Sequence, residues 1–239
     1  MFDLDKIKFA ADEPTFKRAV ALYESGKVTK FKIGLNGFSA VVLGSEPYHV
    51  FVSSKHFDQG DCDCYLGQND TLCKHMVAVA IWAATSGKAL TDQDKQQHNQ
   101  AICSGHLGEL SKTELSKIKQ GITAAMRYIK SYEGPSRTWF AYQDSLTEGC
   151  NRLSAIVSDL PVSLQTARLL IDLLLRLDKK LSSGGVDDSD GTVGGFIEET
   201  VGVLKEFTKL NASCLAAFTE LQGKETCFGW EEPLVKMIG

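Results

Sequence analysis

The chain has 239 residues, of which 43% are hydrophobic, so it is long enough to bury one large core or two smaller ones without disulfides or metals. Its net charge of −4 argues against a protein built around polyanion binding, although a local basic patch is compatible with that balance. The first 14 residues mix charged and apolar side chains and lack the hydrophobic run of a secretory signal or membrane helix, so we expect a cytoplasmic protein without a membrane partner.

The first element expected along the chain is a short amphipathic helix. Apolar residues between Glu13 and Ser25 keep helical spacing, and Gly26 is a typical residue for the end of a helix. The next segment, residues 28–54, contains three runs of β-forming residues separated by an Asn-Gly pair and by a Gly-Ser-Glu-Pro turn. We therefore expect a three-stranded antiparallel meander after the helix.

A cluster of metal-binding residue types follows the meander. Its pattern is Cys62-x-Cys64, eight residues, and then Cys73-x-His75, which supplies three thiolates and one imidazole. Such a donor set suits a tetrahedral divalent metal, and Zn²⁺ is its usual occupant in a reducing compartment. Four protein ligands close the coordination shell, which is typical of one structural zinc ion and not of a catalytic one.

The same spacing predicts where the four ligands lie. Side chains at i and i+2 point the same way on an extended segment and diverge on a helix, so we expect Cys62 and Cys64 on a strand or turn. We expect Cys73 at or just before the first turn of the following helix and His75 just inside it. That helix is apolar and is expected to end at Gly87.

The order CxC, eight residues, CxH, with a small meander before it and an apolar helix after it, resembles the SWIM-type zinc finger of bacterial and archaeal proteins. The resemblance covers residues 13–87 and implies a zinc-binding domain that contacts DNA in some proteins and protein partners in others. In this chain Asp61 and Asp63 alternate with the first two cysteines, where many members have small or polar residues. These carboxylates would repel phosphates at this edge of the finger, which favours a protein partner.

The remaining cysteines do not predict a second site. The chain has seven cysteines, an odd number, and Cys103, Cys150, Cys214 and Cys227 lie far apart, so we expect reduced thiols and no disulfide framework. Cys150 and Cys214 fall on apolar helical stripes and are interpreted as core residues. Cys103 and His106 have the spacing of a metal-binding pair but lack a second pair, so we interpret them as linker residues.

Beyond the finger the chain becomes helical. Residues 91–105 are mostly polar, which predicts a linker between a zinc-finger domain at 1–90 and an α-helical domain at 106–239. Amphipathic patterns predict four long helices in the second domain, over residues 111–129, 139–160, 163–181 and 196–221, with the third most central. The predicted fold class is α+β: a small antiparallel β-meander with a zinc finger and short helices, followed by an all-α, up-and-down helical bundle.

Charge is unevenly distributed in the helical domain. The first and third predicted helices are basic, and we favour a solvated charged face over a surface that follows phosphates. Residues 182–195 read as a flexible acidic loop whose role the sequence leaves open. The cations of the two helices are Lys112, Lys117, Lys119, Arg127, Lys130, Arg168, Arg176, Lys179 and Lys180.

The sequence contains no nucleophile-base constellation, phosphate-binding glycine loop or dinucleotide fingerprint, so we do not expect an enzyme. The leading hypothesis is a non-catalytic, zinc-binding interaction module that recruits or scaffolds a protein partner. The alternative is a nucleic-acid-binding, DNA-associated regulatory protein that uses the finger with a basic strip, formed by Lys27, Lys30 and Lys32 or by the basic first helix of the bundle. A third hypothesis is an enzyme subunit whose active site is completed by a partner. The oligomeric state does not follow from the sequence.

Overall fold

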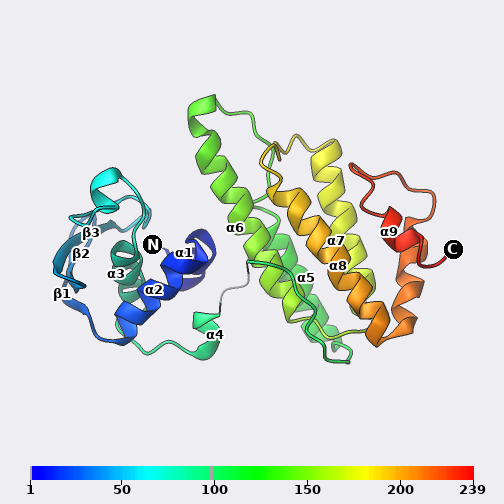
Figure 1. Ribbon diagram of the computed structural model, residues 1–239, viewed down its shortest axis with the longest axis horizontal. Coiled ribbons are helices and arrows are strands. Elements are labelled where there is room, and N and C mark those ends of the chain that lie inside the picture. Colours follow the sequence, from blue (N-terminus) through cyan, green and yellow to red (C-terminus); the bar gives the residue numbers. More distant parts are fainter. Residues whose placement is uncertain (1, 97–98) are drawn as a thin grey trace. The chain divides into compact units, whose positions relative to one another are not determined.

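The structure is a computed structural model, and it describes residues 2–96 and 99–239. The chain divides into two compact units, an N-terminal unit (residues 1–97) and a C-terminal unit (residues 98–239), which Figure 1 shows as ribbons. The boundary falls within the segment predicted as a linker, residues 91–105, of which residues 97 and 98 lie outside the described residues. Each unit is described below by itself.

The described residues of the N-terminal unit form four α-helices, besides the short 3₁₀ helix η1 (Gly67–Asn69). The α-helices are α1 (Leu4–Ala10), α2 (Glu13–Glu24), α3 (Lys74–Thr85) and α4 (Asp92–Lys95). The expected helix after residue 13 is confirmed as α2, which begins where the Asp12 carboxylate accepts a hydrogen bond from the Thr15 amide at 2.8 Å. Helix α1 was not expected from the sequence, because it has only two turns and its charged residues interrupt the apolar pattern.

A four-stranded antiparallel sheet forms the other layer of this unit, in the order β1-β2-β3-β4. The strands are β1 (Val28–Ile33), β2 (Gly37–Leu43), β3 (Pro47–Ser53) and β4 (Gly60–Cys62). The first three are the predicted meander, and the short fourth strand carries the first cysteine of the cluster. Gly37 is required at the start of β2, because a Cβ there would lie 2.2 Å from the carbonyl oxygen of Val52 on the paired strand.

The core of the N-terminal unit lies between the sheet and α3. Helix α3 contacts β2 and β3 on one side and α1 and α2 on the other, so all of its residues from His75 to Ile81 are buried. Phe31 of β1 extends this core by stacking on Trp82 of α3, with ring centroids 3.8 Å apart. Because α3 is buried on both sides, its first turn is a rigid place for metal ligands.

The C-terminal unit consists of helices. The long ones are α5 (Lys112–Ala125), α6 (Trp139–Ser158), α7 (Leu164–Ser182) and α8 (Thr192–Leu210); the short ones are η2 (Ser136–Thr138), η3 (Ala212–Leu221) and α9 (Glu232–Val235). Helix α5 packs on α6, α6 packs on α8, and α7 packs on α8 and η3. Ser111 and Ser163 start α5 and α7 with capping boxes. The predicted α+β class, with a small sheet followed by helices, is confirmed.

The fourth long helix differs from its prediction over residues 196–221. It ends at Leu210, because Asn211 is extended (φ −146°) and its side chain accepts hydrogen bonds from the amide and hydroxyl of Ser213. The chain then continues as the 3₁₀ segment η3. An asparagine side chain that bonds the backbone two residues later competes with the helical hydrogen bonds, so the apolar pattern continues while the helix stops.

The acidic segment 182–195 is tied to the bundle at two points. Asp188 accepts hydrogen bonds from the amides of Val193 and Gly194 at 2.7 and 2.8 Å, in the first turn of α8, and burial raises the pKa of this carboxyl. The Trp139 indole donates to Asp187 at 3.0 Å. Among the described helices, none combines the length and the apolar character that crossing a membrane would require.

Candidate metal centre

The four predicted ligands come from three elements of the N-terminal unit. Cys62 ends β4 opposite the buried Val50 of β3, so its side chain points into the same core. Cys64 lies in the turn that follows, Cys73 is the N-cap of α3, and His75 lies in its first turn. The strand-or-turn position of the first pair and the helix-start position of the second pair agree with the predictions from their spacing.

The structure brings these four residues into one buried group. Their potential ligand atoms all lie within 4.8 Å of one another, and all four residues are buried. His75 Nδ1 lies 3.7 Å from Cys62 Sγ and 3.9 Å from Cys73 Sγ. A tetrahedral zinc ion with ordinary Zn–S and Zn–N bonds would hold sulfur and nitrogen about 3.6 Å apart. The arrangement is therefore compact enough for all four to bind one ion.

Backbone amides support two of the sulfur atoms as anions. Gly67 N donates to Cys64 Sγ at 3.4 Å, and Met76 N, in the first turn of α3, donates to Cys73 Sγ at 3.5 Å. The pKa of the Cys73 thiol is lowered, mainly because the neighbouring Cys62 thiol donates to it, and His75 and the Met76 amide act in the same direction. The pKa of Cys62 is raised by the same shared proton and by burial. The lowered pKa favours the thiolate of Cys73, which is the form that binds metals.

The imidazole of His75 is held by its surroundings. Tyr48 of β3 stacks on it, with ring centroids 4.3 Å apart and the planes 21° from parallel. A Cβ at Gly44 would lie 2.8 Å from the Tyr48 ring and 3.4 Å from His75 Nε2, so a glycine leaves room for this stack. Nδ1 faces the sulfur atoms, whereas Nε2 is buried without a hydrogen-bond partner among the described residues. The ring is therefore oriented with Nδ1 toward the cysteines.

Part of the N-terminal unit matches a known protein family. The SWIM zinc finger family matches residues 48–81, a segment that begins in β3 and ends within α3. Residues 48–81 form a SWIM zinc finger. The finger therefore contains Tyr48 and all four residues of the buried group, and it is narrower than the region 13–87 over which the resemblance was drawn. No curated protein and no solved structure matches the chain.

The donor chemistry of the SWIM finger fits a metal ion. Three buried thiols and an imidazole nitrogen converge on one point, and such a set would be costly to bury if it had no partner. Zinc prefers sulfur donors together with an imidazole nitrogen, arranged as a tetrahedron around one ion. Among the described residues, no other group of three or more His, Cys, Asp or Glu side chains converges in this way.

The other cysteine and histidine positions considered from the sequence lie outside the SWIM finger. Cys150 and Cys214 are buried in the core of the C-terminal unit, as predicted. Cys103 and His106 lie in the segment before α5, and all seven cysteines are free. Within the finger, the role of Gly67 was not predicted, and only its position three residues after Cys64 could have suggested it.

The two aspartates of the SWIM finger occupy its exposed edge. Asp61 faces solvent on β4, and Asp63 accepts a hydrogen bond from the His49 amide at 2.9 Å while lying 3.1 Å from His49 Nδ1. These contacts with His49 lower the pKa of Asp63. The two acidic side chains make this edge of the finger negative.

Proposed function

We propose that the protein is a non-catalytic interaction module, stabilised by one structural zinc ion, that recruits a protein partner through the outer surface of its N-terminal sheet. The ion would be held by Cys62, Cys64, Cys73 and His75. Four protein donors leave no coordination position for water or substrate, so the ion would organise the fold and would not catalyse a reaction. Free thiols suit a reducing compartment, and we place the protein in the cytoplasm.

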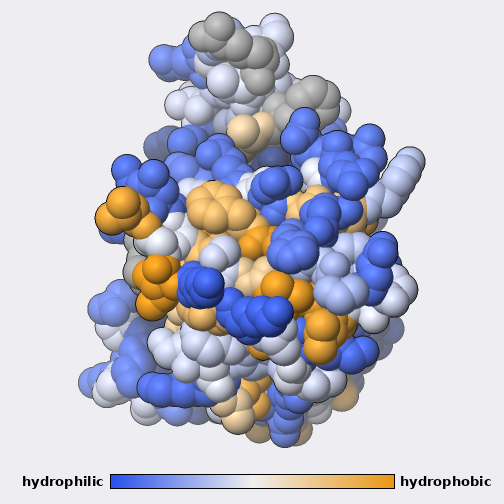
Figure 2. Space-filling view, turned by 90° about the vertical axis from the view of Figure 1, so that its left-hand side faces the viewer, coloured by the Kyte–Doolittle hydropathy of each residue, from blue (hydrophilic) through white to orange (hydrophobic). Residues whose placement is uncertain are grey.

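The observation that carries this proposal is an exposed surface of the sheet that has an aromatic side chain at its centre and charged side chains at its edges. The face of the sheet turned away from α3, which we call the outer sheet surface, forms a shallow hollow of about 650 Å³. Figure 2 shows hydrophobic patches among hydrophilic ones on the side of the molecule where the sheet lies. The side chains of this surface are Lys30, Lys32, Ser39, Val41, His49, Phe51 and Asp61.

Phe51 stands at the centre of the outer sheet surface and is 41% exposed. Two more apolar side chains are exposed at the end of the β1–β2 hairpin, Ile33 (78%) and Leu35 (103%). A single exposed apolar residue is ordinary, but an aromatic side chain on a strand with Val41 beside it and further apolar residues at the nearby hairpin is typical of binding surfaces.

Charge across this surface favours a protein over a nucleic acid. Lys30 and Lys32 lie on β1 at one edge, and Asp61 and Asp63 lie at or just beyond the end of β4 at the other. A nucleic acid that crossed the strands would meet repulsion at the β4 edge, because its phosphates are all negative. A protein surface can present both signs of charge around an apolar centre.

The proposal is tested by comparing what three forms of the full chain capture from the native cell. The first is the wild-type protein, the second carries Phe51→Glu on the outer sheet surface, and the third carries Phe228→Glu, at a similarly exposed position (46%) in the C-terminal unit. We expect a protein captured by the first and third forms and lost from the second. Equal capture by all three forms would show that the outer sheet surface does not bind the partner. Elemental analysis that finds no zinc in the purified protein would contradict the proposed metal site.

The alternative function is nucleic-acid binding, and one observation favours it. Lys27, Lys30 and Lys32 are all exposed at one edge of the sheet, and Lys30 and Lys32 line the same hollow as the aromatic ring of Phe51. A mobility shift with DNA that weakens as salt rises, and is lost in a Lys30→Glu/Lys32→Glu variant, would support this function. An absence of binding at low salt would exclude it. A role as an enzyme subunit whose active site is completed by a partner is the least favoured. The four protein ligands would fill the coordination shell of the ion and leave no position for water or substrate.

A further inference from the structure

A second surface that could receive a partner lies on the C-terminal unit. Two hollows, of about 750 and 500 Å³, lie between α5 and α7, and a third, of about 600 Å³, lies along the exposed side of α5. Leu115, Lys119 and Thr123 belong to two or more of them, and Arg176 joins the second to the third. They therefore form one continuous depression, which we call the α5–α7 groove.

The groove has cationic rims. Seven positive side chains line it against three carboxylates, Glu109, Asp172 and Glu220. Two of the seven cations have partners: Arg176 lies 3.7 Å from Asp172, and Lys180 Nζ donates to the carbonyl of Ile129 at 2.6 Å. In the part of the chain that the structure describes, the other five form no ion pair; they are Lys112, Lys119, Arg127, Arg168 and Lys179.

The floor of the groove is apolar. Leu115 of α5 and Leu164 of α7 are half-buried and pack against the helical core, and Leu169 and Met126 are nearly covered. An apolar floor between cationic rims offers an occupant both a hydrophobic contact and electrostatic attraction. A phosphate backbone would use only the rims, and the three carboxylates would repel it.

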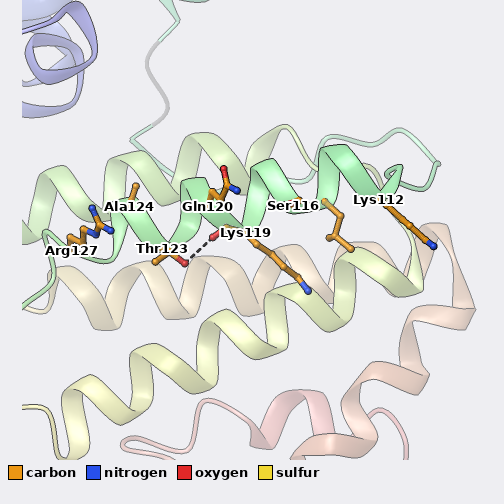
Figure 3. A pocket seen from close by; sticks show the side chains of 8 residues that line it. Lys112, Ser116, Lys119, Gln120, Thr123, Ala124 and Arg127 are labelled. Carbon is orange, nitrogen blue, oxygen red and sulfur yellow. Dashed lines mark hydrogen bonds between the residues drawn. The ribbon is translucent and has the colours of Figure 1, made fainter.

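The α5 side of the groove has the periodicity of a helix-packing surface. Its lining residues repeat every three or four positions, so they form one stripe along the helix: Lys112, Leu115, Ser116, Lys119, Gln120, Thr123, Ala124 and Arg127. Figure 3 shows this stripe, with Lys119 extending toward the neighbouring helix. Small side chains at Ser116, Thr123 and Ala124 allow another helix to approach closely. The stripe spans about 22 Å at the rise of an α-helix, which matches a partner segment of about 15 residues.

We propose that the α5–α7 groove binds an acidic amphipathic helix of a partner protein. Apolar side chains at i, i+3, i+4 and i+7 of that helix would contact the leucine floor, and its carboxylates would pair with the five cations that have no ion pair in the described chain. This inference rests on the proposed function in one respect, that the partner is a protein. It concerns a different surface from the sheet, so each can fail without the other.

The test measures the binding of fluorescent 16-residue peptides to the full-length protein by anisotropy. One peptide has Leu at i, i+3, i+4 and i+7 with Glu and Asp elsewhere. A second has the same leucines with Lys in place of the acids, and a third has the composition of the first in an order that destroys its apolar face. We expect the first peptide to bind at least tenfold more tightly than the other two, and its affinity to fall as salt rises.

Three variants locate the binding on the protein. Lys119→Glu/Arg168→Glu reverses one charge on α5 and one on α7 that line the same hollow, and Thr123→Trp fills the groove without a change of charge. Each variant is expected to bind the first peptide at least tenfold more weakly. Lys205→Glu/Lys224→Glu makes the same change in charge outside the groove and is expected to leave its affinity within twofold. Circular dichroism confirms that each variant remains helical.

The opposite results would overturn the inference. Equal affinity for the acidic and basic amphipathic peptides would show that the cations do not contribute to binding. Unchanged affinity of the acidic peptide for both groove variants would show that the peptide binds outside the groove. A single-stranded oligonucleotide of similar length that binds more tightly than any peptide, and is lost with Lys119→Glu/Arg168→Glu, would assign the groove to nucleic acid. None of these outcomes affects the test made on the outer sheet surface with Phe51→Glu.

Discussion

Gly67 lies against Cys62 so closely that position 67 has no room for a side chain. A Cβ there would be 2.2 Å from the carbonyl oxygen and 2.6 Å from the Cβ of Cys62. Gly67 also donates its amide to Cys64 Sγ, so one residue fixes the positions of two ligands. The contact is with backbone, which cannot rotate out of the way as a side chain can.

Gly67→Ala is therefore expected to weaken zinc binding by about 10- to 100-fold, the usual effect of disturbing residues that orient metal ligands. Competition with a chromogenic chelator measures the affinity. Gly34→Ala is the matched control, because a Cβ at Gly34 meets only one neighbouring atom, at 3.4 Å. If the two variants bound zinc equally well, the close contact at Gly67 would have no role in holding the ligands.

The pKa of the Cys73 thiol is lowered by its contacts with Cys62, His75 and the Met76 amide, which favours the thiolate that a metal ion binds. It is expected that Cys73→Ser lowers the zinc content from about one ion per chain toward zero, because a serine hydroxyl remains protonated and is a poor zinc ligand. Elemental analysis of the purified variant measures this loss. Cys103→Ser, in the C-terminal unit, is expected to retain its zinc, and equal zinc content in both variants would show that the ion lies elsewhere.

The ligands could be predicted from the sequence, whereas the residues that orient them could not. The alternation in Cys62-x-Cys64 predicts a strand or turn, and the pair Cys73-x-His75 predicts a helix start, because side-chain direction follows from local backbone geometry. The stack of Tyr48 on His75 depends on how β3 is packed against α3, and no local pattern records such a packing. The role of Gly67 likewise depends on a contact across the turn.

At the scale of elements, periodicity predicted the helices and strands well but not all of their ends. Helices α5, α6 and α7 begin near the predicted residues because capping serines and a proline mark them. The end of α8 was missed, since the apolar pattern continues beyond Asn211 while the side chain of that residue bonds the backbone and interrupts the helix. The spacing of hydrophobic residues predicts which face of a helix is buried, but it does not predict the residue at which the helix ends.

Helix α8 contains a glycine at a position where a side chain would fit without strain. Gly202 is exposed in the middle of the helix, and a Cβ there would meet nothing within 4 Å. Gly202→Ala is expected to raise the free energy of unfolding of the C-terminal unit by about 0.5–1 kcal/mol, because alanine loses less backbone entropy in a helix. Chemical denaturation followed by circular dichroism measures the change.

Gly191, the N-cap of the same helix, provides the contrast. A Cβ at this position would also meet nothing within 4 Å, but its φ of +76° is in the left-handed region that favours glycine. Gly191→Ala is therefore expected to destabilise the unit by about 1 kcal/mol. A shift of the same sign for both variants would mean that the backbone conformation at one of these positions differs from the structure.

At the scale of the whole molecule, the two units have separate hydrophobic cores. The N-terminal core includes Cys62, Cys64 and Cys73, so the metal site and the packing of that unit depend on each other. The core of the C-terminal unit contains none of the four predicted ligands. Metal binding contributes folding free energy only to the part of the chain that supplies the ligands.

Removal of zinc is therefore expected to unfold the finger and to leave the helical unit folded. Hydrogen exchange measured by mass spectrometry, before and after a strong chelator, should show lost protection in peptides from residues 48–85 and unchanged protection in peptides from residues 139–182. Adding zinc back should restore the first set, which separates loss of the ion from damage to the protein. Simultaneous loss of protection in both sets would contradict the independence of the two cores.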